Sequence, residues 1–422
     1  MAHELDVYLF ADRVGQLSLF NGRLQFAYAA DWLAHARSLP LSQSLPLQAE
    51  VFDDQASRPF FAGLLPEGRM RQLIAKQHQV SRQNDFALLD HIGGECAGAV
   101  SLRNPGQSMG GNVAAADVQW LSQAELATIL DELPSRPMLA GQEGLRLSLA
   151  GAQDKLPVVW DGQRMGLPRN GAPSTHILKP AIEAVPDSVA NEGFCLALAQ
   201  AMQLPAAAAS MHVLDGRSFL LVQRYDRIHD PEGLQRLHQE DFCQALGVVP
   251  EMKYQNEGGP NLAQCFALLR SVTRPSAPQV LHLLDYVVFN ALIGNHDAHG
   301  KNFSLLYATG AVPVLAPLYD TVSTAVYPRL TPKMAMKIGS KYKFSELQPH
   351  HWGAFFRSTG LSPSLAQKRV IALAKRLPTQ ARLLQADPAK GFAQQAVVAH
   401  ITDLIEARCA LTVRRLEEDA AR

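Results

Sequence analysis

The segment 293–304 limits the possible folds and functions of this chain more than any other part of its sequence. It reads Ile-Gly-Asn-His-Asp-Ala-His-Gly-Lys-Asn-Phe-Ser and follows a strongly apolar run, 281–293, that predicts a buried helix. Asp297 and Asn302 stand in the pattern D-x-x-x-x-N, the spacing of a protein-kinase catalytic loop. There a carboxylate orients a substrate hydroxyl, and an amide at a fixed separation helps to hold magnesium. A polar surface loop of turn-forming residues is the alternative, and the spacing alone leaves both open.

A second acid, Asp320, lies in Leu-Tyr-Asp-Thr-Val-Ser, eighteen residues after Asn302. The apolar runs 302–307 and 312–318 predict a hairpin between the two residues. At the far end of that hairpin, Asp320 would return to the ion held by Asn302 and supply the carboxylate that a phosphate-bound magnesium needs. Taken alone, Asp320 is equally a turn or helix-capping residue.

Three stretches earlier in the chain suit a nucleotide. The run 148–155, Ser-Leu-Ala-Gly-Ala-Gln-Asp-Lys, predicts a turn between strands whose small residues let backbone N–H groups approach an anion, although Gly151 alone is typical of any hairpin. A short strand ends at Lys179, which is either a phosphate-binding lysine or a solvated charge. Glu192 lies on the next predicted helix, and we expect it to pair with Lys179.

The apolar strand 219–222 runs into Gln-Arg-Tyr-Asp-Arg, as the last strand of a kinase first lobe runs into its hinge. Backbone groups from Gln223 to Tyr225 would bind adenine there, and Tyr225 would stack on it. The alternative is an ordinary strand end with an Arg–Asp surface pair. Each signal is modest, but turn, lysine, glutamate, hinge, catalytic loop and metal aspartate follow the linear order of a protein-kinase-like phosphotransferase.

Composition limits the remaining possibilities. The chain has 422 residues, of which 47% are hydrophobic and 18% charged, so it can bury a large core and is not a disordered chain. Lys plus Arg and Asp plus Glu both number 39, so the chain has no overall positive charge that would attract nucleic acid. No apolar run approaches the roughly 18 residues of a membrane span, and the N-terminus has no signal-peptide core. Five scattered cysteines without a C-x-x-C pair indicate reduced thiols, so we expect a cytoplasmic protein.

We expect an α+β fold with a strand-rich first lobe, a helical second lobe and an additional N-terminal module. Asn21-Gly22 between two apolar runs predicts a hairpin, and Ser122 with Glu125 predicts a capped helix. The run 145–160 predicts strand, turn and strand, and 104–116 predicts a linker. The expected boundaries are 1–103 for the module, 104–143 for a connecting segment, 144–235 for the first lobe and 236–422 for the second.

Across 5–415 the sequence resembles HipA, the serine/threonine kinase toxin family of bacterial HipBA toxin–antitoxin systems. Its more specific motifs are Gln-Glu-Asp-Phe-Cys-Gln at 239–244 and His-Gly-Lys-Asn-Phe-Ser at 299–304. Further matching stretches are Val-Gly-Gln-Leu at 14–17, Leu-Ser-Gln-Ser-Leu-Pro-Leu at 41–47, Lys253-Tyr254 with Gly-Gly-Pro at 258–260, and Pro-Leu-Tyr-Asp at 317–320.

The resemblance implies a two-lobed kinase that uses ATP and Mg²⁺. It implies Asp297 as catalytic aspartate, Asn302 and Asp320 as metal ligands, Lys179 as nucleotide lysine and Ser148 as an inactivating autophosphorylation site. With the order of the motifs, it places the nucleotide also at Ala150, Gly151, Ala152, Gln153, Asp154, Lys155, Gln223, Arg224, Tyr225, His299, Gly300, Lys301 and Tyr319.

The resemblance also implies partners: a translation component such as an aminoacyl-tRNA synthetase as substrate, and a small helix-turn-helix antitoxin with which the chain represses its own operon. DNA would be bound mainly through the antitoxin. Arg357 matches one family position that contacts DNA, but the second falls on Gly360, so direct contact stays open. A basic helical stripe, Lys368, Arg369, Lys375 and Arg376, is typical of a solvated face.

Two other functions stay open. One is a small-molecule phosphotransferase, which would have an acidic substrate pocket after the catalytic loop, whereas 321–342 is neutral to basic. The other is a non-catalytic co-repressor that binds the antitoxin and DNA.

Overall fold

The computed structural model describes residues 3–107, 117–230, 233–307 and 312–420. The chain divides into two compact units. Apart from the residues not described, the first unit holds Met1–Pro180, His212–Glu251 and Leu305–Ala311, and the second holds Ala181–Met211, Met252–Ser304 and Val312–Arg422. Residues 108–116 of the expected linker 104–116 and the turn of the expected hairpin, 308–311, lie outside the described residues. The boundaries expected after residues 103, 143 and 235 stay predictions.

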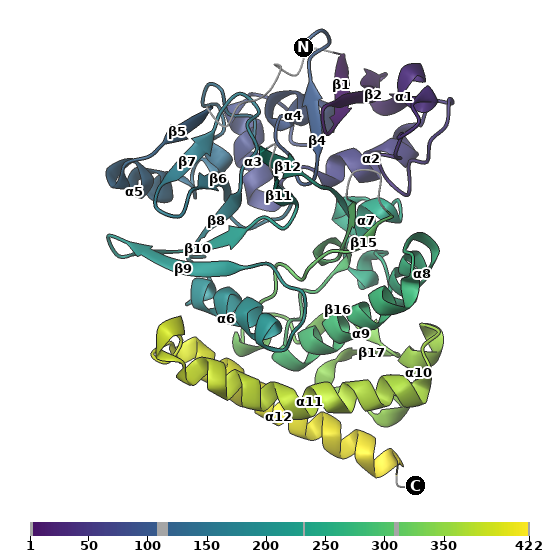
Figure 1. The fold of residues 1–422 in the computed structure, drawn as a ribbon, viewed down its shortest axis with the longest axis vertical. Coiled ribbons are helices and arrows are strands. Elements are labelled where there is room, and N and C mark those ends of the chain that lie inside the picture. The colour runs from purple at the N-terminus through teal and green to yellow at the C-terminus, as the bar shows by residue number, and fades with distance from the viewer. Residues whose placement is uncertain (1–2, 108–116, 231–232, 308–311, 421–422) are drawn as a thin grey trace. The chain divides into compact units, whose positions relative to one another are not determined.

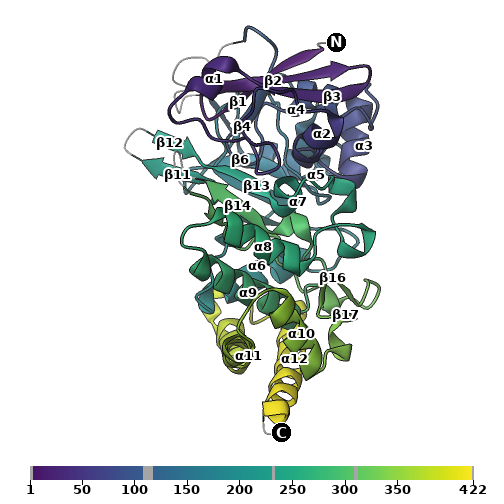
Figure 2. The ribbon, with the colours of Figure 1, turned by 90° about the vertical axis from the view of Figure 1, so that its right-hand side faces the viewer.

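The first unit begins with an antiparallel sheet in the strand order β3-β2-β1-β4, drawn mostly in purple in Figure 2. Asn21 and Gly22, with φ of 50° and 76°, make the predicted hairpin turn between β2 and β3. The short helices pack on this sheet around a core that includes Phe26, Phe60 and Phe61. The elements are β1 (Glu4–Leu9), β2 (Asp12–Phe20), β3 (Arg23–Tyr28), α1 (Ala30–Ala34), α2 (Asp54–Gly63), α3 (Gly68–Gln77), α4 (Asp85–Ile92) and β4 (Val100–Arg103).

A second sheet in the first unit has the strand order β5-β7-β6-β8-β10-β9 (Figure 1). The predicted capping box forms, since the Ser122 hydroxyl accepts the Glu125 N–H and the Glu125 carboxylate accepts the Ser122 N–H. The elements are β5 (Val118–Trp120), α5 (Gln123–Glu132), η1 (Pro137–Leu139), β6 (Leu156–Trp160), β7 (Met165–Pro168), β8 (His176–Pro180), β9 (Ala209–Leu214) and β10 (Arg217–Gln223).

The strand predicted at 145–149 does not form, so that part of the sequence interpretation is wrong. Leu145, Leu147 and Leu149 do alternate inward, and all three are buried in the core of the second sheet. The segment is extended, but its only ladder contact is an isolated bridge between Leu147 and Glu95. The alternating leucines therefore indicated a buried segment and not a strand of a sheet.

The first unit is completed by a β-ribbon, a short capped helix and a strand pair. Asp241 caps α7 by accepting the Gln244 N–H. β13 and β14 are neighbours, which brings Leu305–Tyr307 into this unit. The elements are β11 (Arg227–Asp230), β12 (Gly233–Arg236), β13 (His238–Asp241), α7 (Phe242–Ala245), η2 (Pro250–Met252) and β14 (Ser304–Tyr307).

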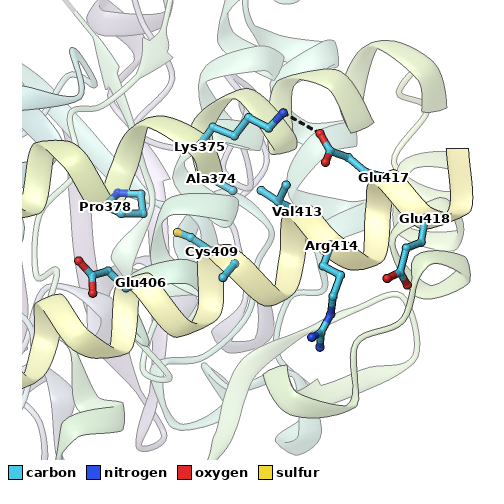
Figure 3. A pocket seen from close by; sticks show the side chains of 10 residues that line it. Ala374, Lys375, Pro378, Glu406, Cys409, Val413, Arg414, Glu417 and Glu418 are labelled. Atoms are coloured by element: carbon cyan, nitrogen blue, oxygen red, sulfur yellow. Dashed lines mark ion pairs between the residues drawn. The ribbon is translucent and has the colours of Figure 1, made fainter. Parts of the chain in front are cut away.

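The second unit is mostly helical, as expected for the segment after 236. Its long helices α11 and α12 lie side by side (Figure 1), and Lys375 pairs with Glu417 at 2.6 Å between them (Figure 3). Arg369 pairs with Asp285 of α9, so two members of the predicted basic stripe are neutralised. The elements are α6 (Ser188–Ala201), η3 (Gln255–Glu257), α8 (Leu262–Val272), α9 (Ser276–Ile293), η4 (Gly300–Asn302), β15 (Val314–Leu315), η5 (Thr324–Val326), β16 (Lys333–Ile338), β17 (Lys341–Lys343), η6 (Phe344–Glu346), α10 (Pro349–Ser358), α11 (Pro363–Ala386), η7 (Pro388–Lys390) and α12 (Ala396–Ala420).

Within the described ranges, none of the helices is long and apolar enough to cross a membrane. The five cysteines are free and buried, and burial raises the pKa of the Cys96, Cys195, Cys265 and Cys409 thiols to about 12.

Candidate active site

The predicted catalytic loop begins where α9 ends. Gly294 terminates the helix with φ of 80°, and an added Cβ there would lie 2.7 Å from the side chain of Ala325, so only glycine fits the turn. Asn295 then stabilises the loop: its Nδ2 donates to Asn290 Oδ1 at 2.8 Å, and its Oδ1 accepts the Asp297 N–H at 3.0 Å. The loop is therefore fixed to the helix by buried amide groups.

Asp297 and Asn302 are joined directly. The Asn302 side-chain Nδ2 donates to the Asp297 backbone carbonyl at 2.9 Å, which closes the D-x-x-x-x-N loop on itself. The Asp297 carboxylate is exposed, and its Oδ1 accepts the Tyr254 hydroxyl at 2.6 Å. The Tyr254 ring also stands edge-on to His299, 5.1 Å between centroids. A solvent-accessible carboxylate that accepts the Tyr254 hydroxyl has the geometry of a group that receives a substrate hydroxyl.

Asp320 is attached to the same loop through its neighbour. The Tyr319 hydroxyl donates to the Lys301 carbonyl at 2.6 Å and lies 2.7 Å from the Ser304 hydroxyl. Asp320 itself has φ of 50°, a left-handed conformation that is uncommon outside glycine and that is found at functional sites. The expected side-by-side placement of the two runs is also present, because the Ala316 N–H donates to the Ser304 carbonyl at 2.8 Å.

His299 is kept neutral in this site. Burial, then the cations Lys253 and Lys301, lower its pKa well below the usual value, and only Asp320 among these side chains acts in the opposite direction. His299 Nδ1 is buried, and no hydrogen-bond partner for it lies within the described residues. A neutral imidazole does not repel a metal cation that binds nearby.

The residues suit magnesium. Hydrogen bonds in the second unit link Asp297 to Asn302 and Tyr319 to Lys301, and Asp320 follows Tyr319; their roles stay predictions. In the described part of the chain, no three His, Cys, Asp or Glu side chains gather into a metal cluster. One amide and one carboxylate fit a Mg²⁺ ion that takes its other ligands from phosphate oxygens and water.

In the first unit, the predicted phosphate loop is closed on itself. Lys155 is buried, and its Nζ donates to the Ala150 carbonyl at 2.7 Å. Gly151 has φ of 106°, and a Cβ there would lie 2.7 Å from that Nζ. Burial raises the pKa of Asp154, while Arg69 and Lys155 counteract it. Gln153 and Ala152 complete the turn.

Ser148 is fully buried at the start of this loop. Its hydroxyl donates to the Leu64 carbonyl at 2.9 Å, and its N–H donates to the Glu95 carbonyl at 2.8 Å. The segment therefore packs against the N-terminal residues with its hydroxyl inside.

Lys179 is buried near the end of β8, opposite Leu220 of β10. Glu192 is buried on α6 in the second unit. Their pairing stays a prediction.

The predicted hinge holds a feature that the sequence did not indicate. Gln223 is exposed and the Tyr225 hydroxyl donates to Gln239, but the Arg224 side chain is only 1% exposed. Arg224 contacts Glu95 at 3.1 Å and Asp226 at 2.7 Å, so the alternative of a surface Arg–Asp pair is wrong. Glu95, Arg224, Asp226, Arg227 and Arg236 form one buried group, the Arg–acid cluster.

The cluster sets the charge of its acids. Burial alone would raise the pKa of Glu95, but Arg236, Arg227 and Arg224 lower it to about 2. Burial would likewise raise the pKa of Asp226, but neighbouring arginines lower it, and Arg224 has the largest effect among them. Both carboxylates are ionised at neutral pH.

Sequence reasoning missed Tyr254 and Glu95. Tyr254 belongs to a stretch that matches the family, so the resemblance pointed to this residue but did not indicate its function. Glu95 follows two glycines and precedes a cysteine, and nothing in that context indicates three arginine partners far away in the chain.

Comparisons with known proteins match both parts of the chain. A family model described as the HipA N-terminal domain matches residues 5–103, and one described as the HipA-like C-terminal domain matches residues 147–381. A putative kinase of Sinorhizobium fredii, Y4mE, is 45% identical over 394 residues, which cover 93% of this chain and 94% of that protein. The serine/threonine-protein kinase toxin HipA of Shewanella oneidensis is 28% identical over 422 residues, 96% of this chain and 95% of that one.

The structure is also similar to a solved one. HipA in the complex of Shewanella oneidensis HipA, HipB and operator DNA has a TM-score of 0.85 and 26% identity, with 98% of each chain covered. The predicted fold class, α+β and kinase-like with an additional N-terminal subdomain, is confirmed by this match.

Proposed function

Because the chain belongs to the HipA family, we propose that it is an ATP- and Mg²⁺-dependent serine/threonine protein kinase that acts as a toxin. The observation that most supports this proposal is the network in which Asn302 bonds the Asp297 backbone and Tyr319 bonds the loop at Lys301. It holds an exposed carboxylate, an amide and the Asp320 position on one rigid framework.

In the proposed reaction, the acceptor hydroxyl of a serine or threonine donates to Asp297. The hydroxyl oxygen forms a bond to the γ-phosphorus, the bond from that phosphorus to the β-phosphate oxygen breaks, and the hydroxyl proton passes to the Asp297 carboxylate. Asn302 and Asp320 would hold the Mg²⁺, which neutralises phosphate charge when bound. Lys179 and the 150–155 loop would bind the nucleotide phosphates, and the 223–225 backbone would bind adenine.

The biological role is part of the same proposal. The substrate would be a component of translation, such as an aminoacyl-tRNA synthetase, and the enzyme would be cytoplasmic. Autophosphorylation of Ser148 would switch it off, because a charge near −2 cannot be placed in the buried site that its hydroxyl occupies.

A helix-turn-helix antitoxin of the HipB type would bind the chain, and the pair would repress its own operon. The Shewanella relative was solved with HipB and operator DNA, which supports this partner. We assign DNA contact mainly to the antitoxin, since Gly360 stands at one of the two positions where the family contacts DNA.

The kinase assignment is tested by the transfer of labelled phosphate from ATP to protein. Wild-type protein and Asp297→Asn are incubated with a cell lysate, γ-labelled ATP and Mg²⁺, and the labelled proteins are compared. The wild type is expected to label lysate proteins and itself, with the phosphate of the self-label at Ser148, and Asp297→Asn to label neither. Because Asp297 is exposed, the variant should keep its melting temperature. Equal labelling by both proteins would contradict the assignment.

A further inference from the structure

A cavity of about 450 Å³ opens beside Asp297 within the second unit. Asp297 and Tyr254 line it, together with the apolar residues Leu330, Met334 and Ala335. None of the residues assigned to the nucleotide in the preceding sections is in this lining, and Asp297 and Tyr254 are the part of it that belongs to the catalytic site. The remaining lining is therefore available for the other reactant.

The walls of the cavity are tied together by hydrogen bonds. The Ala335 N–H of β16 donates to the carbonyl of His296, the residue before Asp297, at 2.8 Å. The Lys337 N–H donates to Gln255 Oε1 at 2.7 Å, which attaches β16 to the residue after Tyr254. His296 Nδ1 also lies 2.9 Å from the Thr331 carbonyl. The cavity is thus a built feature of the catalytic loop and β16, and its shape does not depend on a single loop.

The lining holds both apolar and polar residues. Met334 and Ala335 are buried, while Leu330 is 41% exposed and so offers a large apolar side chain to a ligand. Lys333 and Glu257, both exposed, carry opposite charges. An apolar group that covers Leu330 removes apolar surface from water, and this lowers the free energy of the complex.

We propose that this cavity binds an apolar side chain, such as Leu, Met or Phe, two positions from the phosphoacceptor in the protein substrate. The inference rests on the proposed kinase function and adds a substrate preference to it. An acceptor hydroxyl at Asp297 and an apolar group against Leu330 occupy one cavity. In an extended substrate segment they belong to positions two residues apart, because successive side chains point to opposite faces. Such positions are roughly 6.6 Å apart along the chain, which suits a cavity of this size.

The test uses the full chain and serine peptides that are identical except at the positions two residues before and two residues after the serine. We expect peptides with Leu, Met or Phe at one of these positions to have a kcat/KM about tenfold above those with Gly or Asp. Leu330→Asp should reduce this ratio to nearly one. A ratio between two peptides does not change when part of the enzyme is misfolded.

Leu383→Asp is the matched control, because Leu383 is also exposed, at 61%, but lies on α11 and not in the cavity. It should keep the wild-type ratio. If the wild type phosphorylates peptides or lysate proteins without an apolar preference, or Leu330→Asp keeps the preference, the inference is wrong and the kinase assignment stands. If the wild type labels neither itself nor any lysate protein, the kinase assignment fails, and the inference fails with it.

Discussion

The Tyr254 hydroxyl donates a hydrogen bond to the Asp297 carboxylate at 2.6 Å. This contact selects one orientation of an otherwise exposed carboxylate. A donor to a charged group contributes roughly 1.5–3 kcal/mol, which is enough to fix that orientation before the substrate arrives.

Tyr254→Phe should therefore lower kcat about tenfold, because Asp297 would no longer be held toward the acceptor hydroxyl. The KM for ATP should stay near its wild-type value. Steady-state kinetics with varied ATP measure both parameters. Tyr8→Phe, which removes only a long 3.4 Å bond to the Gln107 carbonyl in the first unit, should leave both unchanged.

Tyr319→Phe should weaken the response to magnesium. The variant loses the bonds to the Lys301 carbonyl and the Ser304 hydroxyl that hold the segment carrying Asp320. We expect the Mg²⁺ concentration for half-maximal labelling to rise severalfold, with activity recovered at high Mg²⁺. An unchanged magnesium curve would show that Tyr319 does not position Asp320.

The Arg–acid cluster predicts loss of stability in acid. The pKa of Glu95 falls from the usual 4.5 to about 2 on folding, so its ionised form stabilises the fold above pH 4.5 and that stability is lost as pH falls toward 2. The difference corresponds to about 3 kcal/mol. Denaturant unfolding at several pH values should show Glu95→Gln less stable at pH 7 and with a smaller loss below pH 4.5. Glu50→Gln, at an exposed residue, should follow the wild type.

Glu240 predicts that the stability of the fold decreases as pH rises, which is the opposite dependence. Its burial raises the pKa to about 7, although Ser42, Tyr307 and Gln43 donate hydrogen bonds to it and lower the pKa. The folded protein thus holds a proton that the unfolded chain releases near pH 4.5, and this contribution to stability is lost as pH rises through about 7. The free energy of unfolding of Glu240→Gln should lack this decline between pH 4.5 and 7. If wild type and variant decline equally, another group is responsible.

Phosphorylation of Ser148 should open the segment around it. Its hydroxyl is buried against the Leu64 carbonyl, so a phosphate or a Glu at this position has to move out. Ser148→Glu should be cleaved faster by a protease within 146–155, while Ser148→Ala should be cleaved at nearly the wild-type rate. Ser135→Glu, at an exposed serine, provides the control.

Local signals in the sequence predicted most of the framework correctly. The Asn21-Gly22 turn, the Ser122 cap and the Asp297–Asn302 loop each depend on residues at most five positions apart, so their physics is contained in a short window. The strand expected at 145–149 failed because alternation reports burial and cannot identify a ladder partner.

Ion pairs between residues far apart in the chain could not be predicted from the sequence. The role of Arg224 depends on Glu95, 129 residues away, and a surface pair with the nearby Asp226 was the interpretation that the local sequence allowed. The bond from Tyr254 to Asp297 spans 43 residues and depends on how the 253–259 turn meets the catalytic loop. Such contacts follow from tertiary packing, which one sequence does not specify without homologues.

The Arg–acid cluster has a consequence for dissecting the molecule. Glu95 lies inside the stretch matched by the HipA N-terminal domain, whereas its three arginine partners all lie more than a hundred residues later. A fragment cut between the two matched regions would keep the three arginines with Asp226 but would lose Glu95, the acid that pairs with all three. Neither half should then be expressed as a well-behaved protein on its own, and the N-terminal stretch is better regarded as an integral component than as a removable accessory.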